Sequence, residues 1–382
     1  MVEQEDVIWM RQALELAEKS LYISAPNPRV ACLIVRDGQL LASGSTQQAG
    51  GPHAEVMALR QAKERGVNVA GATFYVTLEP CSHHGRTPPC ADALVKAGAG
   101  RVVFSMYDPN PLVAGNGVSR LRQAGITVDG PLCVEQALAI NAGFFARMTR
   151  GRPWLWMKMA ASLDGRSALP DGRSQWITGP QARDDGHHWR ARSCVVLTGI
   201  GTVHADNPLM NVRAVSTPRP PIKAVLDTHL RMDPKAALLD GTPCWVFSHR
   251  RDPEREAELA DRNAQVIPMP LHEGQVDVRA VLDWMTDQQI NEVHAEAGAR
   301  LSGALIDAGV VDQLLMYLAP KILGQGRGVA DITELAGLDD VEPFEFTDVR
   351  LLGADLRVLA RQRDHWEALL RAVGGAYPPD SE

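Results

Sequence analysis

The sequence predicts an α/β protein that is built from two domains. The chain has 382 residues, which is too long for one ordinary hydrophobic core. Segments typical of strands and segments typical of helices alternate in both halves. The segment TRGRP at 149–153 interrupts this alternation. We therefore expect domains at 1–149 and 150–370, followed by a disordered tail at 371–382.

The first half begins with an amphipathic helix, because Val7, Met10, Leu14, Ala17 and Leu21 recur at helical spacing. Apolar runs and turn residues predict the other elements of this half. They are a hairpin at 31–42, helices at 53–66, 90–98 and 133–148, and strands at 73–78 and 101–106.

The second half restarts with a buried strand and continues as repeated strand–helix units. Strands are predicted at 154–161, 194–199, 222–227, 244–248, 291–297 and 312–324, helices at 179–193, 252–263, 277–288 and 298–308, and a terminal hairpin at 348–361. This order favours a mostly parallel sheet that is covered on both faces.

Composition excludes several classes of protein. The net charge is −7 and neither half has a basic excess, which argues against a nucleic-acid binder but allows a small anionic substrate. No apolar run is long enough to span a membrane, and the acidic N-terminus is not typical of a signal peptide. The six cysteines are scattered, so we expect reduced thiols in the cytoplasm and no disulfide between Cys81 and Cys90.

The stretch CSHHGRTPPC at 81–90 is the strongest chemical signal. A catalytic zinc ion takes three protein ligands and keeps one position open. Cys81 follows a predicted strand and Cys90 begins a predicted helix, so both sulfurs can converge. His53 opens another helix after a Gly-Gly-Pro turn and is the expected third ligand. Glu55 lies two residues further on and is the expected general acid/base.

This arrangement matches the zinc deaminases, which combine H-x-E with P-C and a second cysteine. Eight residues separate the two cysteines here, where two are usual. A closed structural zinc site that includes His83 or His84 is the alternative. Consecutive side chains point apart, however, and such a site would leave His53 and Glu55 unexplained. The remaining cysteines are expected in the core: Cys32, Cys133, Cys194 and Cys244.

Seven motifs then occur in order: PHAE, VTLEPCSHHGRTPPC, DPNPLVAG, KMAASLDG, SQWITG, HADNP and APKILG. Together they resemble the bifunctional deaminase/reductase family of riboflavin biosynthesis over about residues 5–360. The resemblance implies an N-terminal cytidine-deaminase-like αβα domain and a C-terminal dihydrofolate-reductase-like α/β domain. It also implies zinc-dependent deamination of 2,5-diamino-6-ribosylamino-4(3H)-pyrimidinone 5′-phosphate, followed by reduction of the ribosyl to the ribityl side chain with NADPH. We expect a homo-oligomer.

The resemblance assigns further residues of the first half. Asn27 corresponds to a substrate contact, although an ordinary Asn-Pro turn is equally consistent with PNPRV. Residues 83–87 correspond to a wall of the substrate pocket, although they could merely shape the loop. The chain departs from the family at Ala31, where glycine is usual, and at Thr46, where histidine is usual. The second departure puts one substrate contact in doubt.

In the second half, the resemblance assigns NADP contacts to Ala160, Trp176, Thr202, Asp206 and Thr228, and substrate contacts to Ser174, Arg190, Met210, Arg213 and Glu296. Arginine suits this role because its guanidinium group binds phosphate oxygens bidentately. Any single arginine could equally be a solvated surface charge. Asp206 is the best ionisable candidate near the transferred hydride.

Two further residues of this half stand out. Gly298 lies at a strand–turn–helix junction, where backbone N–H groups could hold a cofactor phosphate or simply form a tight turn. Lys158 lies within an apolar strand, so it either faces the substrate site or forms a structural ion pair. The chain departs from the family at Ala160, where glycine is common, and at His294, where an apolar residue is usual.

Two rival functions remain at this point. A nucleic-acid deaminase with an accessory domain would need a basic, aromatic surface that the sequence does not provide. A zinc-stabilised binding protein without turnover would have no need for Glu55 beside the three ligands. Both observations favour the metabolic enzyme.

Overall fold

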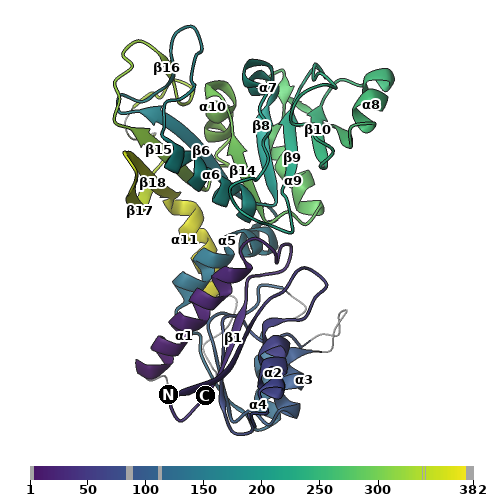
Figure 1. Ribbon diagram of the computed structural model, residues 1–382, viewed down its shortest axis with the longest axis vertical. Coiled ribbons are helices and arrows are strands. Elements are labelled where there is room, and N and C mark those ends of the chain that lie inside the picture. Colours follow the sequence, from purple (N-terminus) through teal and green to yellow (C-terminus); the bar gives the residue numbers. More distant parts are fainter. Residues whose placement is uncertain (1–3, 83–88, 111–113, 338, 340, 376–382) are drawn as a thin grey trace. The chain divides into compact units, whose positions relative to one another are not determined.

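The computed structural model describes residues 4–82, 89–110, 114–337, 339 and 341–375. The chain divides into two compact units, which are described separately (Figure 1). One unit is Met1–Arg150 together with Ala368–Glu382, and the other is Gly151–Glu367. In the described part of the chain, no helix is both long and apolar enough to cross a membrane.

The first unit is built on a five-stranded sheet with the order β2-β1-β3-β4-β5. The strands are β1 (Ala31–Arg36), β2 (Gln39–Ser45), β3 (Thr73–Val76), β4 (Arg101–Phe104) and β5 (Thr127–Asp129). Strand β1 is antiparallel to β2 and β3, whereas β3, β4 and β5 are parallel. The residues that precede β1 and those that follow β3 and β4 therefore lie at one edge of the sheet.

Helices cover both faces of this sheet. They are α1 (Gln4–Ala17), the 3₁₀ turn η1 (Glu18–Ser20), α2 (Ala54–Glu64), α3 (Cys90–Lys96), α4 (Asn116–Gln123) and α5 (Val134–Arg150). Figure 1 shows α1 on one side of β1 and the group α2, α3 and α4 on the other. Helix α2 packs closely on β2 at Gly44, where a Cβ atom would lie 2.4 Å from the Ala54 carbonyl oxygen. This approach requires glycine and places the start of α2 on the sheet.

A buried ion-pair network joins α1 to the sheet. Asp6 is 2% exposed and accepts hydrogen bonds from the Arg101 guanidinium at 2.7 and 2.9 Å. The Tyr75 hydroxyl also donates to Asp6, and Arg101 pairs with Asp129 at the edge strand. The amphipathic pattern of the first helix did not predict a buried carboxylate on its apolar face.

The second unit is built on a nine-stranded sheet with the order β11-β10-β9-β8-β14-β6-β15-β18-β17. Its strands are β6 (Trp154–Ser162), β8 (Val195–Gly199), β9 (Ile222–Leu226), β10 (Cys244–Ser248), β11 (Ala264–Pro268), β14 (Glu292–Glu296), β15 (Gln313–Ala319), β17 (Phe344–Leu352) and β18 (Asp355–Gln362). The strands from β11 to β15 are parallel, and only the terminal hairpin β17–β18 is antiparallel. The mostly parallel sheet is thereby confirmed.

Two short strand pairs flank this sheet: β12 (Leu271–His272) with β13 (Gln275–Val276), and β7 (Arg166–Ala168) with β16 (Arg327–Gly328). The helices are α6 (Pro180–Arg192), α7 (Ile200–Asp206), α8 (Pro253–Ala260), α9 (Val278–Asp287), α10 (Ala299–Asp307) and α11 (Arg363–Gly375), which begins in this unit. The fully buried Val196, Val225 and Val246 come from three neighbouring strands and belong to one core cluster. Asp252 and Asp277 accept backbone N–H groups at the starts of α8 and α9, as N-cap residues do.

The structure differs from the predicted elements at several places. Helices α4, α7 and α11 and strands β5 and β11 were missed, and the strand predicted at 312–324 ends at Ala319. Residues 371–375 belong to α11 rather than to a tail, because Trp366, Leu369 and Val373 give this helix a buried side. Residues 376–382 lie outside the described residues. Cys32, Cys194 and Cys244 are buried as expected, but Cys133 is partly exposed at the start of α5.

We expect Arg101→Met to destabilise the first unit by about 3 kcal/mol, because Asp6 would remain buried without its cation. Hydrogen–deuterium exchange of the β3 and β4 amides measures this loss. The matched control is Arg120→Met, which breaks an exposed pair with Asp92 and should cost no more than about 1 kcal/mol. Equal protection in the two variants would contradict a structural role for the buried network.

Candidate functional site

The predicted zinc ligands converge at the edge of the first sheet where β3 and β4 end. Cys81 follows β3, Cys90 begins α3, and His53 is the N-cap residue of α2. These three residues form the group that could hold a metal ion in the described part of the chain, and their donor atoms all lie within 4.8 Å of one another. The prediction that a distant histidine joins both cysteines is consistent with this geometry.

The distances within this triad suit zinc. His53 Nδ1 lies 3.3 Å from the sulfur of Cys90 and 3.6 Å from that of Cys81. Ligands at roughly 2.0–2.3 Å from a tetrahedral zinc ion are separated by roughly 3.3–3.8 Å. One imidazole and two thiols would leave one coordination position open, as in catalytic sites.

Local structure holds the two sulfurs in place. The backbone N–H of Cys90 donates to the sulfur of Cys81 at 3.3 Å, and the N–H of Ala91 donates to the Cys81 carbonyl oxygen. A hydrogen bond from Cys90, with further support from His53, lowers the pKa of Cys81 to about 4. The thiolate form that a metal needs is therefore favoured at Cys81.

Glu55 lies in the first turn of α2 and is 4% exposed. Burial, assisted by the negative charge of Cys81, raises the pKa of Glu55 to about 7. A carboxyl group with a pKa near neutrality can both accept and return a proton under physiological conditions. The position and the environment of Glu55 both fit a general acid/base.

Two buried carboxyl groups that were not predicted from the sequence, Glu79 and Asp108, lie in the segments next to this triad. Glu79, in the motif EPC, is 3% exposed and accepts four backbone N–H groups from the segment after β4. Asp108, in the motif DPNP, is 8% exposed, and burial together with the charge of Glu79 raises its pKa to about 7. The only sequence signal for either residue is its position within a motif that carries the family resemblance.

The segment that contains Asn27 lies at the same edge of the sheet. The side-chain amide of Asn141 donates to the Arg29 carbonyl oxygen at 2.9 Å and accepts the Arg29 N–H at 2.7 Å. Asn27 itself is partly buried, and its backbone N–H donates to the Ser24 carbonyl oxygen. The Thr46 hydroxyl accepts the Val30 N–H, so this departure from the family serves the local backbone. Residues 83–87, the expected pocket wall, lie outside the described residues.

In the second unit, three of the expected cofactor residues follow neighbouring parallel strands. Thr228 follows β9, Thr202 follows β8 and Gly298 follows β14, and these strands are adjacent in the order β9-β8-β14. Gly298 also lies close to Thr202, because a Cβ atom on Gly298 would be 3.7 Å from the Thr202 hydroxyl. Ligands of open α/β sheets bind at such carboxyl edges.

The charged residues among the expected substrate contacts of this unit form a cluster. Glu296 pairs in register with Lys158 and forms a bidentate ion pair with Arg190. Although burial opposes ionisation, the Arg190 charge holds the pKa of Glu296 well below its usual range. Arg190 also donates to the Asn211 carbonyl oxygen, and Arg213 donates to the Asn211 side chain.

Lys158 and Arg190 differ in whether they have an ionic partner in the described structure. Arg190 forms an ion pair with Glu296, and this pair can serve a structural role. Within the described residues Lys158 forms no direct ion pair, and its ammonium group lies 6.0 Å from the centre of the Tyr317 ring. Burial lowers the pKa of Lys158. A half-buried amine without a direct ionic partner in the described residues favours the site-facing interpretation of Lys158.

The other residues that the resemblance assigns to the cofactor or the substrate do not form one cluster with these groups. Met210 turns its side chain into the core cluster, which leaves only its backbone for a ligand. Asp206 is exposed at the end of α7, and Trp176 is 64% exposed beneath the Arg183 guanidinium. The remaining two, Ala160 and Ser174, are partly buried, and Ala160 pairs with Tyr317 of β15.

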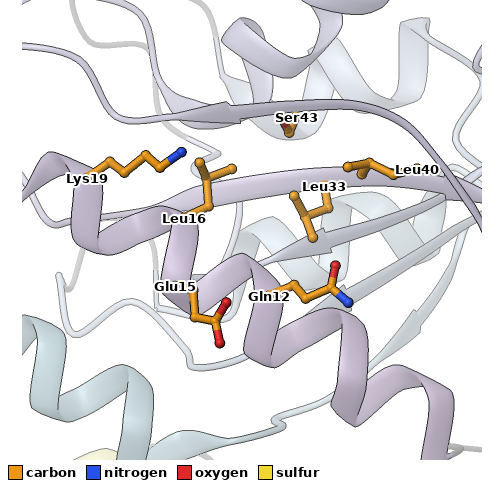
Figure 2. Close-up of a pocket in the computed structure, with 7 residues that line it drawn as sticks. All are labelled: Gln12, Glu15, Leu16, Lys19, Leu33, Leu40 and Ser43. Atoms are coloured by element: carbon orange, nitrogen blue, oxygen red, sulfur yellow. The ribbon is translucent and has the colours of Figure 1, made fainter.

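A surface depression of about 390 Å³ lies elsewhere on the first unit (Figure 2). It is lined by Gln12, Glu15, Leu16, Lys19, Leu33, Leu40 and Ser43, which come from α1, η1, β1 and β2. Ser43 and Gly44 are consecutive strand residues and point to opposite faces, and Gly44 faces α2. The depression is therefore on the sheet face opposite α2 and the zinc triad.

Comparison with known proteins identifies a family for each of the two units. Residues 153–356 match the model of the RibD C-terminal domain, and residues 3–106 match that of the cytidine and deoxycytidylate deaminase zinc-binding region. The riboflavin biosynthesis protein RibD of Escherichia coli (strain K12) is 44% identical over 365 residues, which cover 92% of this chain and 98% of that protein. The chain belongs to the RibD family.

Solved structures of RibD proteins have the same fold. Acinetobacter baumannii RibD, form 1, is 42% identical with a TM-score of 0.85, over 94% of this chain and 99% of that one. A deaminase/reductase from Thermotoga maritima is 31% identical with a TM-score of 0.84, over 94% and 99% of the two chains. As a member of the RibD family, the protein is a bifunctional enzyme of riboflavin biosynthesis, with a zinc-dependent deaminase and an NADPH-dependent reductase.

We expect Cys90→Ser to lose bound zinc, because a hydroxyl group does not provide the thiolate that the triad requires. Metal analysis of the purified full chain should fall from about one zinc per chain to less than a tenth of that value. Cys133→Ser is the matched control, since Cys133 is a partly exposed thiol of the same unit outside the triad. Full zinc content in Cys90→Ser would exclude Cys90 as a ligand.

Proposed function

We propose that residues 1–149 deaminate 2,5-diamino-6-ribosylamino-4(3H)-pyrimidinone 5′-phosphate and that residues 150–370 reduce its ribosyl side chain. The observation that carries this proposal is the convergence of His53, Cys81 and Cys90 beside a buried Glu55. The Thermotoga maritima relative is named as diaminohydroxyphosphoribosylaminopyrimidine deaminase and 5-amino-6-(5-phosphoribosylamino)uracil reductase. The product would be 5-amino-6-ribitylamino-uracil 5′-phosphate.

In the deaminase, His53, Cys81 and Cys90 would hold the zinc ion. Zinc, when bound, activates a water molecule for attack on the ring carbon that carries the amino group. Glu55 would accept the proton of that water, deliver it to the ring nitrogen and assist the departure of ammonia. Its buried position supports this role, because a carboxyl group with a pKa near 7 loses and regains a proton at little cost.

In the reductase, Thr202, Thr228 and Gly298 would bind NADPH at the carboxyl edge of the sheet. NADPH supplies the hydride that reduces the ribosyl group. Gly298 is the N-cap residue of α10, so backbone N–H groups of this helix start are available to a phosphate. Ala160, Trp176 and Asp206 complete the proposed cofactor set.

The substrate of the reductase would bind beside the charged cluster. Arg213 is exposed and is the proposed anchor for the sugar phosphate, whereas Arg190 and Glu296 hold one another in place. Lys158 has no direct ionic partner in the described structure and would face the ribosyl group. The further proposed contacts are Ser174 and Met210 in this unit and Asn27 in the deaminase.

We also propose a cytoplasmic homo-oligomer. The proposal of a cytoplasmic protein rests on the six scattered cysteines, which favour reduced thiols. The edge strand β17 presents Phe346, Val349 and Leu351 with exposed fractions of 78%, 54% and 72%. Exposed apolar side chains on the last strand of the sheet, which pairs only with β18 in the described structure, support self-association at this edge.

We expect Glu55→Gln to keep its zinc but to lose ammonia release by about 10²–10⁴-fold, because an amide cannot shuttle the proton. The test follows ammonia and NADPH together on the diaminopyrimidine phosphate. NADPH oxidation with added deaminated intermediate serves as the internal control and should be unchanged. Normal ammonia release by this variant would disprove the proton-transfer role, and absence of both signals in the unmodified protein would disprove the proposed reaction.

We expect Arg213→Ala to raise the KM of the reductase for the deaminated intermediate by about tenfold or more, since a charge-assisted hydrogen bond to phosphate is lost. Steady-state NADPH oxidation measures this change, and kcat should change little. Arg262→Ala removes another exposed cation, just before β11 at the amino end of the parallel sheet, and serves as the control. An unchanged KM in Arg213→Ala would argue against the phosphate anchor.

A further inference from the structure

Glu79 is the most heavily hydrogen-bonded carboxylate near the zinc triad. One oxygen accepts the N–H groups of Gly117 and Val118 at 2.9 and 3.1 Å. The other accepts the N–H groups of Gly115 and Asp108 at 2.9 and 3.3 Å. Four donors therefore converge on a side chain that is 3% exposed.

These donors come from a segment that is remote from Glu79 in sequence. Asp108 lies just after β4, whereas Gly115 to Val118 form the start of α4. The first N–H groups of a helix have no partner within the helix, and the carboxylate supplies one. The Glu79 N–H also donates to the Met106 carbonyl oxygen at 2.7 Å. Glu79 thus binds both the exit of β4 and the entrance of α4.

The start of α4 also packs directly on the segment that leads to Cys81. A Cβ atom on Gly117 would lie 1.9 Å from the Pro80 carbonyl oxygen and 3.1 Å from Glu79 Oε1. Backbone contacts backbone at this point, so neither segment can shift without the other. Cys81 is the next residue after Pro80, and the charge of Asp108 acts on both Cys81 and His53.

We propose that Glu79 is a positioning residue of the deaminase, which sets the place of Asp108 and of the start of α4 against the zinc-ligand segment. In the described part of the chain the carboxylate accepts hydrogen bonds from backbone N–H groups and not from the zinc-ligand side chains, so it acts through the backbone that it holds. The proposal rests on the deaminase assignment of the first unit. It adds a residue that acts by holding the backbone beside the site and not by proton transfer or by binding the metal.

The decisive variant is Glu79→Gln, which keeps the shape and removes the charge. In either orientation of the amide, its NH₂ group would face two backbone N–H groups, so two of the four hydrogen bonds are lost. We expect the deaminase KM to rise and kcat/KM to fall by about tenfold to a hundredfold. Bound zinc should stay at one per chain, and the reductase should be unchanged on added deaminated intermediate.

Two further measurements keep the proposal testable if this variant folds poorly. Gly117→Ala leaves Glu79 intact but separates α4 from Pro80, and it should reproduce the rise in KM. Amide exchange at Gly115, Gly117 and Val118 should accelerate at least tenfold in Glu79→Gln. Glu64→Gln, at the exposed end of α2, is the control and should change neither quantity.

Each outcome has a distinct meaning. Unchanged amide exchange and unchanged KM in Glu79→Gln would overturn the positioning role. Loss of zinc in proportion to activity would also overturn it, because Glu79 would then act only on the metal site. Failure of the unmodified protein to release ammonia would refute the proposed deamination alone, since amide exchange is measured without substrate.

Discussion

The direction of strand β3 is the constraint on which the deaminase site depends. Because β3 is antiparallel to β1 and parallel to β4, the residues that follow β3 and β4 share one edge with those that precede β1. The loop from β2 and the start of α2 reach the same edge, since β2 is antiparallel to β1. His53, Cys81 and the segment of Asp108 therefore meet at one edge of the sheet, where Glu79 then holds the Asp108 segment.

The carboxylates of Glu79 and Glu296 are balanced in different ways. In the first unit, the carboxylate of Glu79 is balanced by backbone N–H groups, which carry no net charge and cannot leave the site. In the second unit, Glu296 is balanced by the guanidinium of Arg190, a full opposite charge. Asp6 of the first unit resembles Glu296 in this respect, because it is paired with the guanidinium of Arg101.

The sequence predicted the long elements well and the short ones poorly. Strand β6 was predicted because it is a long apolar run, and helix α9 because its apolar residues recur at helical spacing. Helix α4 was missed because its start is fixed by Glu79, almost forty residues earlier, rather than by a local cap. Helix α7 follows β8 without a turn, and α11 lies within a segment that was assigned partly to a tail.

The sequence by itself determined the chemistry of this protein: the residue types and order of His53, Glu55, Cys81 and Cys90, and with them the family. These signals are local, since each is a short motif at the start of a helix or the end of a strand. Only the tertiary structure decided which polar groups are buried and what balances them. The role of Glu79 was invisible because its partners are backbone N–H groups, which every residue except proline carries and no sequence distinguishes.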